Sequence, residues 1–162
     1  MKIGVISDTH IPERATEIPP KALEGLKGSD LIIHAGDISR LQVLEELKKV
    51  CANVKAVWGN MDPEDIKNGF PRKEIITAGS HKIGVMHGWG HPGSLLRVLS
   101  EEFRGEDVDT VIFGHSHQPF NEYHNGILYF NPGSPTDKIF SPYTSYGILE
   151  INDKIEGRIV RL

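Results

Sequence analysis

The sequence MKIGVISDTH, residues 1–10, is the segment from which the fold can be read. Residues 2–7 are short, apolar and rich in Ile and Val, which predicts a buried β-strand. Asp8-Thr9-His10 follows directly, so polar side chains stand at the end of an apolar element. In parallel α/β sheets, ligands bind at the carboxyl ends of the strands. The segment therefore predicts a strand of such a sheet with a candidate site at its end.

The next fifty residues predict a β-α-β-α-β unit. Apolar strands are expected at residues 30–35 and 54–58. A helix is expected at 20–27, because a proline stands at its start and a glycine follows its end. A second helix is expected at 40–50, where apolar residues recur near helical spacing. This order predicts a parallel sheet with helices on its faces.

The second half of the chain predicts mainly strands. A hairpin is expected around Gly79-Ser80, and one amphipathic helix is expected at residues 94–103. The expected strands cover residues 73–77, 82–87, 110–113, 120–123, 127–130, 146–151 and 155–160. Two sheets packed face to face with helices outside are the simplest α/β arrangement for so many strands. The pattern leaves open which strand belongs to which sheet.

Length and charge narrow the class of protein. The length of 162 residues predicts one domain, residues 1–162. The formal net charge is −4, so the chain lacks the net positive charge that is typical of nucleic-acid-binding proteins. The single cysteine, Cys51, excludes an intrachain disulfide and a cysteine-rich zinc site. The apolar stretches are too short for a signal peptide or a membrane span. We therefore expect a cytoplasmic protein that binds neither a nucleic-acid polymer nor a membrane.

Polar clusters follow five of the apolar strands, and their side chains are nitrogen and oxygen ligands for metals. The seven candidates are Asp8, His10, Asp37, Asn60, His87, His115 and His117. Taken alone, most of these clusters are better explained as a tight turn or a buried histidine, although His115 and His117, two residues apart at a strand end, point the same way. Seven ligands at one sheet edge exceed what one tetrahedral zinc uses, and they suit two adjacent metals that share a carboxylate. The joint pattern predicts a dinuclear metal site.

These motifs resemble those of the calcineurin-like metallophosphoesterases. The matching segments, in chain order, are Asp8-x-His10, Gly36-Asp37, Gly59-Asn60, His87-Gly88 and Gly114-His115-x-His117. The resemblance covers residues 3 to about 150. The short length, Asp62 and the Asn131-Pro132-Gly133-Ser134 turn are similar to the small YfcE-like phosphodiesterases of this superfamily. The resemblance implies a two-sheet β-sandwich flanked by helices.

The resemblance also implies a ligand set and a mechanism. One metal would be held by Asp8, His10, Asp37 and His117, and the other by Asp37, Asn60, His87 and His115. Asp37 would bridge two divalent ions, and a hydroxide between them would attack phosphorus in line. Manganese is the expected metal, with nickel, iron, cobalt or zinc as alternatives. Asp37 and Asn60 are thereby also candidate catalytic residues.

One position departs from the wider superfamily. Many of its phosphatases carry Gly-Asn-His-Glu, in which the His is thought to protonate the leaving group. Here the segment is Gly59-Asn60-Met61-Asp62, and Met61 cannot donate a proton. A site without that acid should prefer good leaving groups. His91, in the next loop, is a candidate substitute, and an ordinary loop histidine is the equal alternative.

Two classes of function are consistent with this fold. The first is a metal-dependent phosphodiesterase that hydrolyses a small phosphodiester. The second is a non-catalytic interaction scaffold, similar to the retromer subunit that shares the fold. All seven candidate ligands are present, which favours the enzyme. A homo-oligomer is possible, because small members of the family often self-associate.

Overall fold

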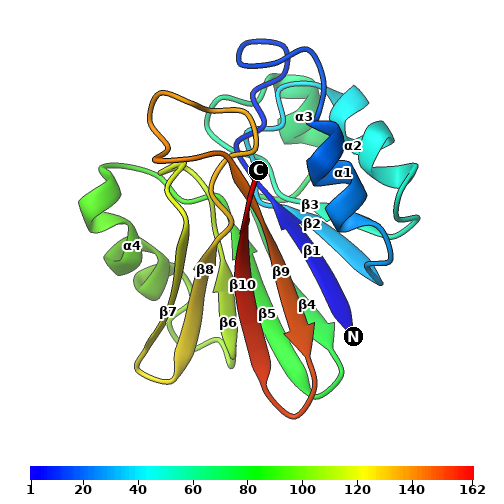
Figure 1. Cartoon of the computed structure of the whole chain (residues 1–162). Helices are drawn as coiled ribbons and strands as arrows, with labels where there is room; N and C mark the ends of the chain where they lie inside the picture. Colours follow the sequence, from blue (N-terminus) through cyan, green and yellow to red (C-terminus); the bar gives the residue numbers. More distant parts are fainter.

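Two five-stranded sheets face each other in the computed structural model, which describes all of residues 1–162 (Figure 1). The first sheet has the order β10-β9-β1-β2-β3. Its strands are β1 (Lys2–Ile6), β2 (Leu31–His34), β3 (Val54–Ala56), β9 (Ser145–Ile151) and β10 (Ile155–Arg161). The first three are parallel, β9 pairs antiparallel with β1, and β10 pairs antiparallel with β9.

The second sheet has the order β4-β5-β6-β8-β7. Its strands are β4 (Lys73–Ala78), β5 (His81–Met86), β6 (Thr110–Ile112), β7 (Phe120–His124) and β8 (Ile127–Asn131). The central strands β5, β6 and β8 are parallel, and the two edge strands pair antiparallel with their neighbours. The parallel strands run from the centre to the β3 edge in the first sheet and form the centre of the second, and they deliver loops to one end of the molecule.

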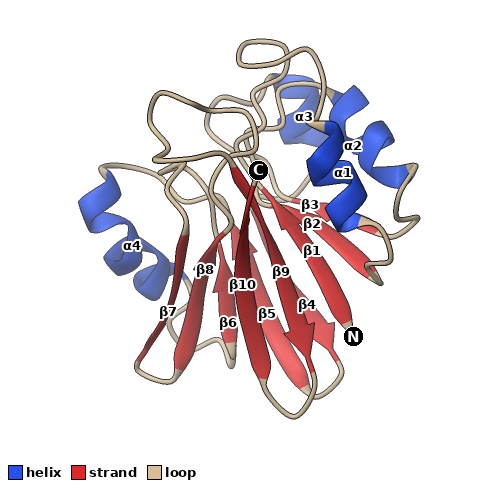
Figure 2. Ribbon diagram, in the orientation of Figure 1, coloured by secondary structure: helices blue, strands red, loops and turns tan.

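Helices cover the outer faces of both sheets (Figure 2). The helices are α1 (Pro20–Leu26), α2 (Leu41–Lys48), α3 (Glu64–Gly69) and α4 (Leu95–Glu102), with a 3₁₀ turn η1 (Pro92–Ser94) before α4. Figure 2 shows α1, α2 and α3 beside the first sheet and α4 beside the second. The result is a four-layer α/β/β/α arrangement, so the predicted fold class is confirmed.

Side-chain alternation along the strands builds this arrangement. Ile3 and Val5 of β1 lie in the buried cluster between the sheets, together with Ile83 and Val85 of β5. Ile6 of β1 instead belongs to the cluster beneath the helices of the first sheet. Full burial of such a side chain is worth about 1.5–3 kcal/mol. A strand that is apolar on both faces is stable here because both faces are covered.

All ten predicted strands and three of the four α-helices were found. The sequence analysis missed α3, which has only six residues and a single buried side chain, Ile66. A helix with one buried contact leaves no apolar periodicity in the sequence. Helix α3 begins after Pro63 and carries Glu64 and Asp65 in its first turn, where acidic side chains interact favourably with the positive end of the helix dipole.

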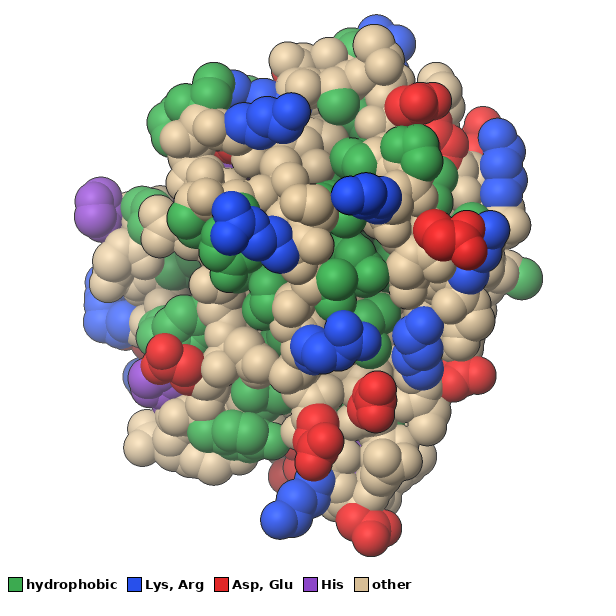
Figure 3. Space-filling model, in the orientation of Figure 1, with side chains coloured by type: hydrophobic (Ala, Val, Ile, Leu, Met, Phe, Trp, Pro, Cys, Tyr) green, Lys and Arg blue, Asp and Glu red, His purple; other side chains and the backbone are tan.

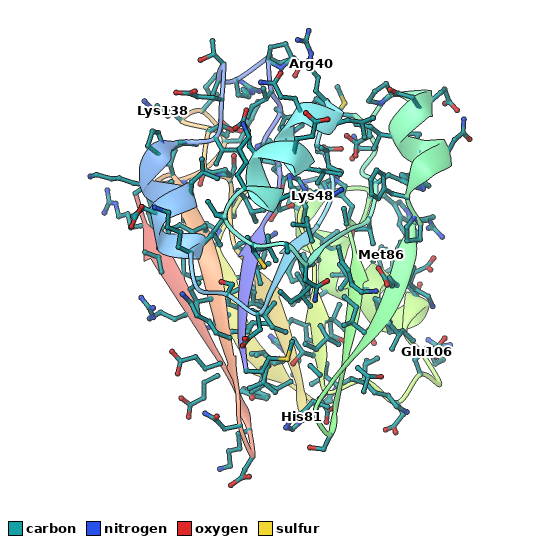
Figure 4. The ribbon with its side chains drawn as sticks, turned by 90° about the vertical axis from the view of Figure 1, so that its right-hand side faces the viewer. Arg40, Lys48, His81, Met86, Glu106 and Lys138 are labelled. Atoms are coloured by element: carbon teal, nitrogen blue, oxygen red, sulfur yellow. The ribbon has the colours of Figure 1, made fainter.

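The loops after the parallel strands gather at one end of the molecule. Figure 4 shows Arg40, in the loop after β2, and Lys138, in the loop after β8, at this end, and His81 of the β4–β5 hairpin at the opposite end. The face seen in Figure 3 carries both acidic and basic side chains. None of the helices combines the length and the apolarity that a membrane crossing requires.

Candidate metal centre

All seven predicted ligands follow the carboxyl ends of parallel strands. The structure buries Asp8, His10, Asp37 and His87, leaves His115 and His117 half-buried, and leaves Asn60 exposed. Two carboxylates buried in this way are costly unless a positive charge or several donors surround them. The arrangement therefore needs an electrostatic partner.

Four of the seven form one tight group. Asp8, His10, Asp37 and His117 each place a nitrogen or oxygen atom within 4.8 Å of the others. His10 Nε2 lies 3.5 Å from Asp37 Oδ2 and 3.1 Å from His117 Nε2, which itself lies 3.4 Å from Asp8 Oδ1. Atoms that converge in this way from separate loops surround a point where a cation fits.

The ring tautomers of three histidines are settled by their outer hydrogen bonds. His87 Nδ1 lies 2.7 Å from the Ala35 carbonyl oxygen, which can only accept, so this nitrogen carries the proton. His117 Nδ1 bonds to the Asp137 carboxylate, and His115 Nε2 lies 2.7 Å from the Gly90 carbonyl oxygen. When each ring is neutral, its second nitrogen carries a lone pair, which is what metal ligation requires.

Two of these lone pairs face other oxygen acceptors beside the first group. His115 Nδ1 lies 2.9 Å from Asn60 Oδ1, and His87 Nε2 lies 3.2 Å from Asp37 Oδ2. A lone pair of His87 Nε2 and the Asp37 carboxylate oxygen repel unless a proton or a metal ion lies between them, whereas the Asn60 amide is able to offer His115 either its oxygen or its NH2 group. Asp37 Oδ2 thus lies close to a histidine of each group, to His10 Nε2 at 3.5 Å and to His87 Nε2 at 3.2 Å.

Two buried atoms in this cluster have no hydrogen-bond partner, namely Asp8 Oδ2 and His87 Nε2. Unpartnered buried polar atoms are rare and costly, and a metal ion would satisfy both. Burial alone would raise the pKa of the Asp37 carboxyl, but the close approach and charge of His87, whose Nε2 lies 3.2 Å away, and the Met61 N–H lower it. Burial lowers the pKa of His87, but Asp37 and Asp8 outweigh this and raise it. The cluster therefore attracts positive charge, and its donor set fits a divalent ion.

The backbone at five of the seven ligands is in the left-handed region. The φ angles are 54° at Asp8, 42° at His10, 55° at Asp37, 68° at His115 and 58° at His117. Non-glycine residues adopt this conformation in only a few per cent of cases, and strained backbone of this kind is enriched at functional sites. These turns aim the side chains inward at a cost of stability.

This strain predicts a difference between two substitutions at His115. Both His115→Ala and His115→Gly remove the imidazole, but only glycine adopts a φ of 68° without steric cost. We expect the glycine variant to be about 0.5–1 kcal/mol more stable than the alanine variant. Urea unfolding of the metal-free proteins measures this difference. Equal free energies of unfolding would contradict a strained turn.

Glycines allow the ligand loops to approach one another. A Cβ at Gly59 would lie 2.2 Å from Asp37 Oδ1, and a Cβ at Gly114 would lie 2.0 Å from Ser7 Oγ and 2.7 Å from Asp8 Oδ2. Any side chain at either position would displace a carboxylate of the cluster. The Gly59-Asn60 and Gly114-His115 pairs are therefore required by packing as well as by turn geometry.

The comparison with known proteins agrees with this geometry. A family model described as a calcineurin-like phosphoesterase superfamily domain matches residues 1–154. The chain belongs to this superfamily. It is 42% identical to a probable metallophosphoesterase of Methanocaldococcus jannaschii, over 99% of this chain and 81% of that protein. Together, the family and the ligand cluster identify this chain as a metal-dependent phosphoesterase, a hydrolase.

Solved structures of two kinds resemble this phosphoesterase. One is an archaeal phosphodiesterase, with a TM-score of 0.78 and 29% identity over 100% of both chains. Another is Vps29 of Entamoeba histolytica in complex with zinc, with a TM-score of 0.79 and 28% identity over 99% of both chains. The fold thus occurs both in an enzyme and in a protein named for vacuolar sorting.

Sequence reasoning missed two buried carboxylates of this phosphoesterase. Asp62 accepts hydrogen bonds from the backbone N–H groups of Asp37 (3.1 Å), Ser39 (2.7 Å) and Gly59 (2.7 Å). It thereby holds the Asp37 loop against the Gly59-Asn60 loop. Burial raises the pKa of Asp62, although these N–H donors oppose the rise. In the sequence, Asp62 was noted only as part of the Gly59-Asn60-Met61-Asp62 segment. A residue that joins two loops leaves no local sequence pattern.

Asp137 is the second missed residue. It is fully buried, and one oxygen contacts His117 Nδ1 while the other accepts from the N–H groups of Ile139 (2.7 Å) and Phe140 (3.2 Å). Burial alone would raise its pKa, but these N–H groups and His117 lower it. A carboxylate behind a metal-binding histidine orients the ring and increases its basicity.

Asp137→Asn is therefore expected to weaken metal binding by about 10- to 100-fold while the fold is retained. An amide has one acceptor oxygen, so it cannot serve both His117 and the two N–H groups. Calorimetric titration with Mn²⁺ measures the loss. Asp153→Asn, in an exposed turn, is the matched control. Unchanged affinity in Asp137→Asn would contradict an orienting role.

Asn131 and Ser134 lie behind the ligand loops. Asn131 Nδ2 donates to the Gly114 carbonyl oxygen at 2.8 Å, and Ser134 Oγ donates to the Asp8 carbonyl oxygen at 2.7 Å. The Asn131-Pro132-Gly133-Ser134 turn thus supports the backbone of two ligand loops.

His91 lies at the margin of the site. Its side chain is exposed, and Nδ1 accepts a hydrogen bond from the Gly93 N–H at 3.1 Å, which caps the turn η1. A cavity of about 540 Å³ opens over the metal ligands, and Met61 and Pro92 line it whereas His91 does not. The alternative of an ordinary loop histidine thereby gains support, and the proton-donor role stays a prediction.

Proposed function

We propose that this phosphoesterase is a phosphodiesterase that works with two divalent ions. The observation that carries the proposal is the convergence of two histidine nitrogens from different loops on one oxygen of Asp37. His10 Nε2 and His87 Nε2 approach the same carboxylate oxygen at 3.5 and 3.2 Å from opposite loops. A shared carboxylate between two histidine groups is the arrangement expected of a dinuclear site.

Each group would hold one ion. Asp8, His10 and His117 complete the first set with Asp37, and Asn60, His87 and His115 complete the second. Mixed imidazole, carboxylate and amide donors favour manganese or a neighbouring first-row metal. When bound, divalent ions lower the pKa of water toward about 7 and offset charge on the phosphoryl oxygens.

The protein residues keep these ligands ready for a reaction. Asp62 holds the loops of Asp37 and Asn60 together, and Asp137 orients His117, so little reorganisation is needed during turnover. The cavity over the cluster admits a small molecule, and it is lined mainly by polar side chains such as Ser116 and Gln118. The proposed substrate is therefore a small phosphodiester that lies with its phosphorus against Asp37 and Asn60.

The diester preference rests on the position of Met61. Its side chain is 64% exposed and lines the cavity, at the sequence position where related phosphatases carry a histidine. A thioether donates no proton, so a poor leaving group is not assisted from this position. Diesters with stable leaving anions should react faster than alkyl monoesters.

The test combines metal analysis with a substrate pair. The full chain, loaded separately with Mn²⁺, Zn²⁺ or Ni²⁺, is assayed with bis(4-nitrophenyl) phosphate and with 4-nitrophenyl phosphate. We expect two ions per chain and a higher kcat/KM for the diester. One ion per chain would contradict the dinuclear site, and faster monoester hydrolysis would contradict the diester preference.

A non-catalytic scaffold is the competing function, and the structural likeness to Vps29 is the observation in its favour. Because that Vps29 structure holds zinc, metal binding alone does not separate the two functions, and hydrolysis decides between them. Metal binding with no hydrolysis of either substrate would favour the scaffold.

A further inference from the structure

An exposed aromatic ring stands beside the metal ligands. Phe140 is 60% exposed and lines the same cavity as His10, Asp37 and His117. Its ring centroid lies 6.1 Å from that of His117, in an edge-on arrangement. Its place in the wall of this cavity, rather than its exposure, makes the ring available to a bound ligand, which would remove its apolar surface from water.

The ring is held in place by the chain around it. Asp137 accepts from the Phe140 N–H at 3.2 Å and from the neighbouring Ile139 N–H at 2.7 Å. The other oxygen of the same carboxylate contacts His117. One buried residue therefore sets the position of the ring and of a metal ligand together. The backbone that carries Phe140 is therefore anchored beside the cavity that its ring lines.

Arg14 completes this wall. Its guanidinium carbon lies 5.4 Å from the Phe140 ring centroid, within the range of a cation–π contact. Arg14 also lines the cavity, forms no ion pair, and is tied to the ligand loop because its N–H donates to the His10 carbonyl oxygen at 2.7 Å. A guanidinium that has no ion pair and lies beside an aromatic ring is suited to a planar ligand that also carries an anionic oxygen.

We infer that Phe140 and Arg14 form a subsite for a planar aromatic group attached to the phosphodiester, so that the substrates are nucleoside or aryl diesters. This inference rests on the proposed function, since it places the phosphorus at the ligand cluster. The aromatic group stacks at Phe140, and Arg14 contacts the phosphate oxygens. Glu13 lines the same cavity, and its charge offsets that of Arg14. Selectivity therefore comes from the ring rather than from net charge.

Two ligands that differ only in the base test the subsite. Adenosine 5′-monophosphate and ribose 5-phosphate are titrated calorimetrically into the Mn²⁺-loaded full chain and recovered intact afterwards. Stacking of a base on an aromatic side chain should strengthen binding of the nucleotide roughly tenfold or more. Phe140→Ala should remove this difference, and Phe140→Tyr should restore it. Arg14→Ala should weaken both ligands by a similar factor.

Ile139→Ala is the matched control, because Ile139 is 71% exposed, precedes Phe140 and does not line the cavity. It should leave both affinities unchanged. Equal affinity of the wild type for the two ligands, or a preference that survives Phe140→Ala, would overturn the subsite. If the protein hydrolyses diesters but binds adenosine 5′-monophosphate and ribose 5-phosphate equally well, the phosphodiesterase is supported and the subsite is rejected. A base preference without any hydrolysis would support the subsite and reject the phosphodiesterase.

Discussion

Asp37→Asn is expected to abolish nearly all phosphoesterase activity while the protein stays folded. Loss of a residue behind a metal ligand already costs about 10- to 100-fold in affinity, and Asp37 is proposed to touch two ions directly. The amide has one acceptor oxygen, whereas the Asp37 carboxylate faces the Met61 N–H with one oxygen and His10 and His87 with the other. Both proposed ions should therefore be weakened together.

The fold should survive this change. Asn tolerates the left-handed backbone better than most residues, which suits the φ of 55° at this position. The Asn oxygen still accepts the Met61 N–H, which lies 2.8 Å from the carboxylate in the wild type. Circular dichroism, metal content and kcat/KM for bis(4-nitrophenyl) phosphate are the measurements. Asp107→Asn, whose side chain is 96% exposed, is the control. Substantial turnover by a folded, metal-reconstituted Asp37→Asn protein would rule out the bridging role.

Met61→His is expected to raise activity toward monoesters with poor leaving groups. Met61 lines the cavity and is well exposed, so an imidazole at this position has room to approach the leaving oxygen. A positioned general acid is typically worth about 10²–10⁴-fold, and the gain should be largest for alkyl leaving groups. The slope of log kcat/KM against leaving-group pKa should therefore become shallower in Met61→His.

His91→Ala distinguishes the competing source of the proton. If His91 already protonates the leaving group, its removal should slow alkyl esters far more than aryl diesters. The cap on the turn η1 occupies His91 Nδ1, which leaves only Nε2 for such a role. Arg97→Ala, on the exposed side of α4, serves as the control for surface substitution nearby. A shallow wild-type slope that neither variant changes would reject both proposals.

The strands and the ligand types were predictable because both depend on local sequence. Ile3, Val5 and Ile6 are apolar on both faces of their strand. They therefore indicate a buried strand even when its neighbours in the sheet are unknown. Asp8, His10 and the later histidines follow such strands directly, so their position at a sheet edge follows from the parallel pairing. The short helix α3 escaped prediction because only Ile66 is buried in it.

By itself, the sequence determined ten strands, three helices and the chemistry of the ligands, since periodicity and turn residues act over a few neighbours. Only the tertiary structure decided that β9 pairs with β1, that Asp137 orients His117, and that Phe140 meets Arg14. These contacts join segments far apart in the chain, and no local pattern encodes them. They arise because two sheets must cover each other's apolar faces, and that packing brings the loops of both sheets to one end.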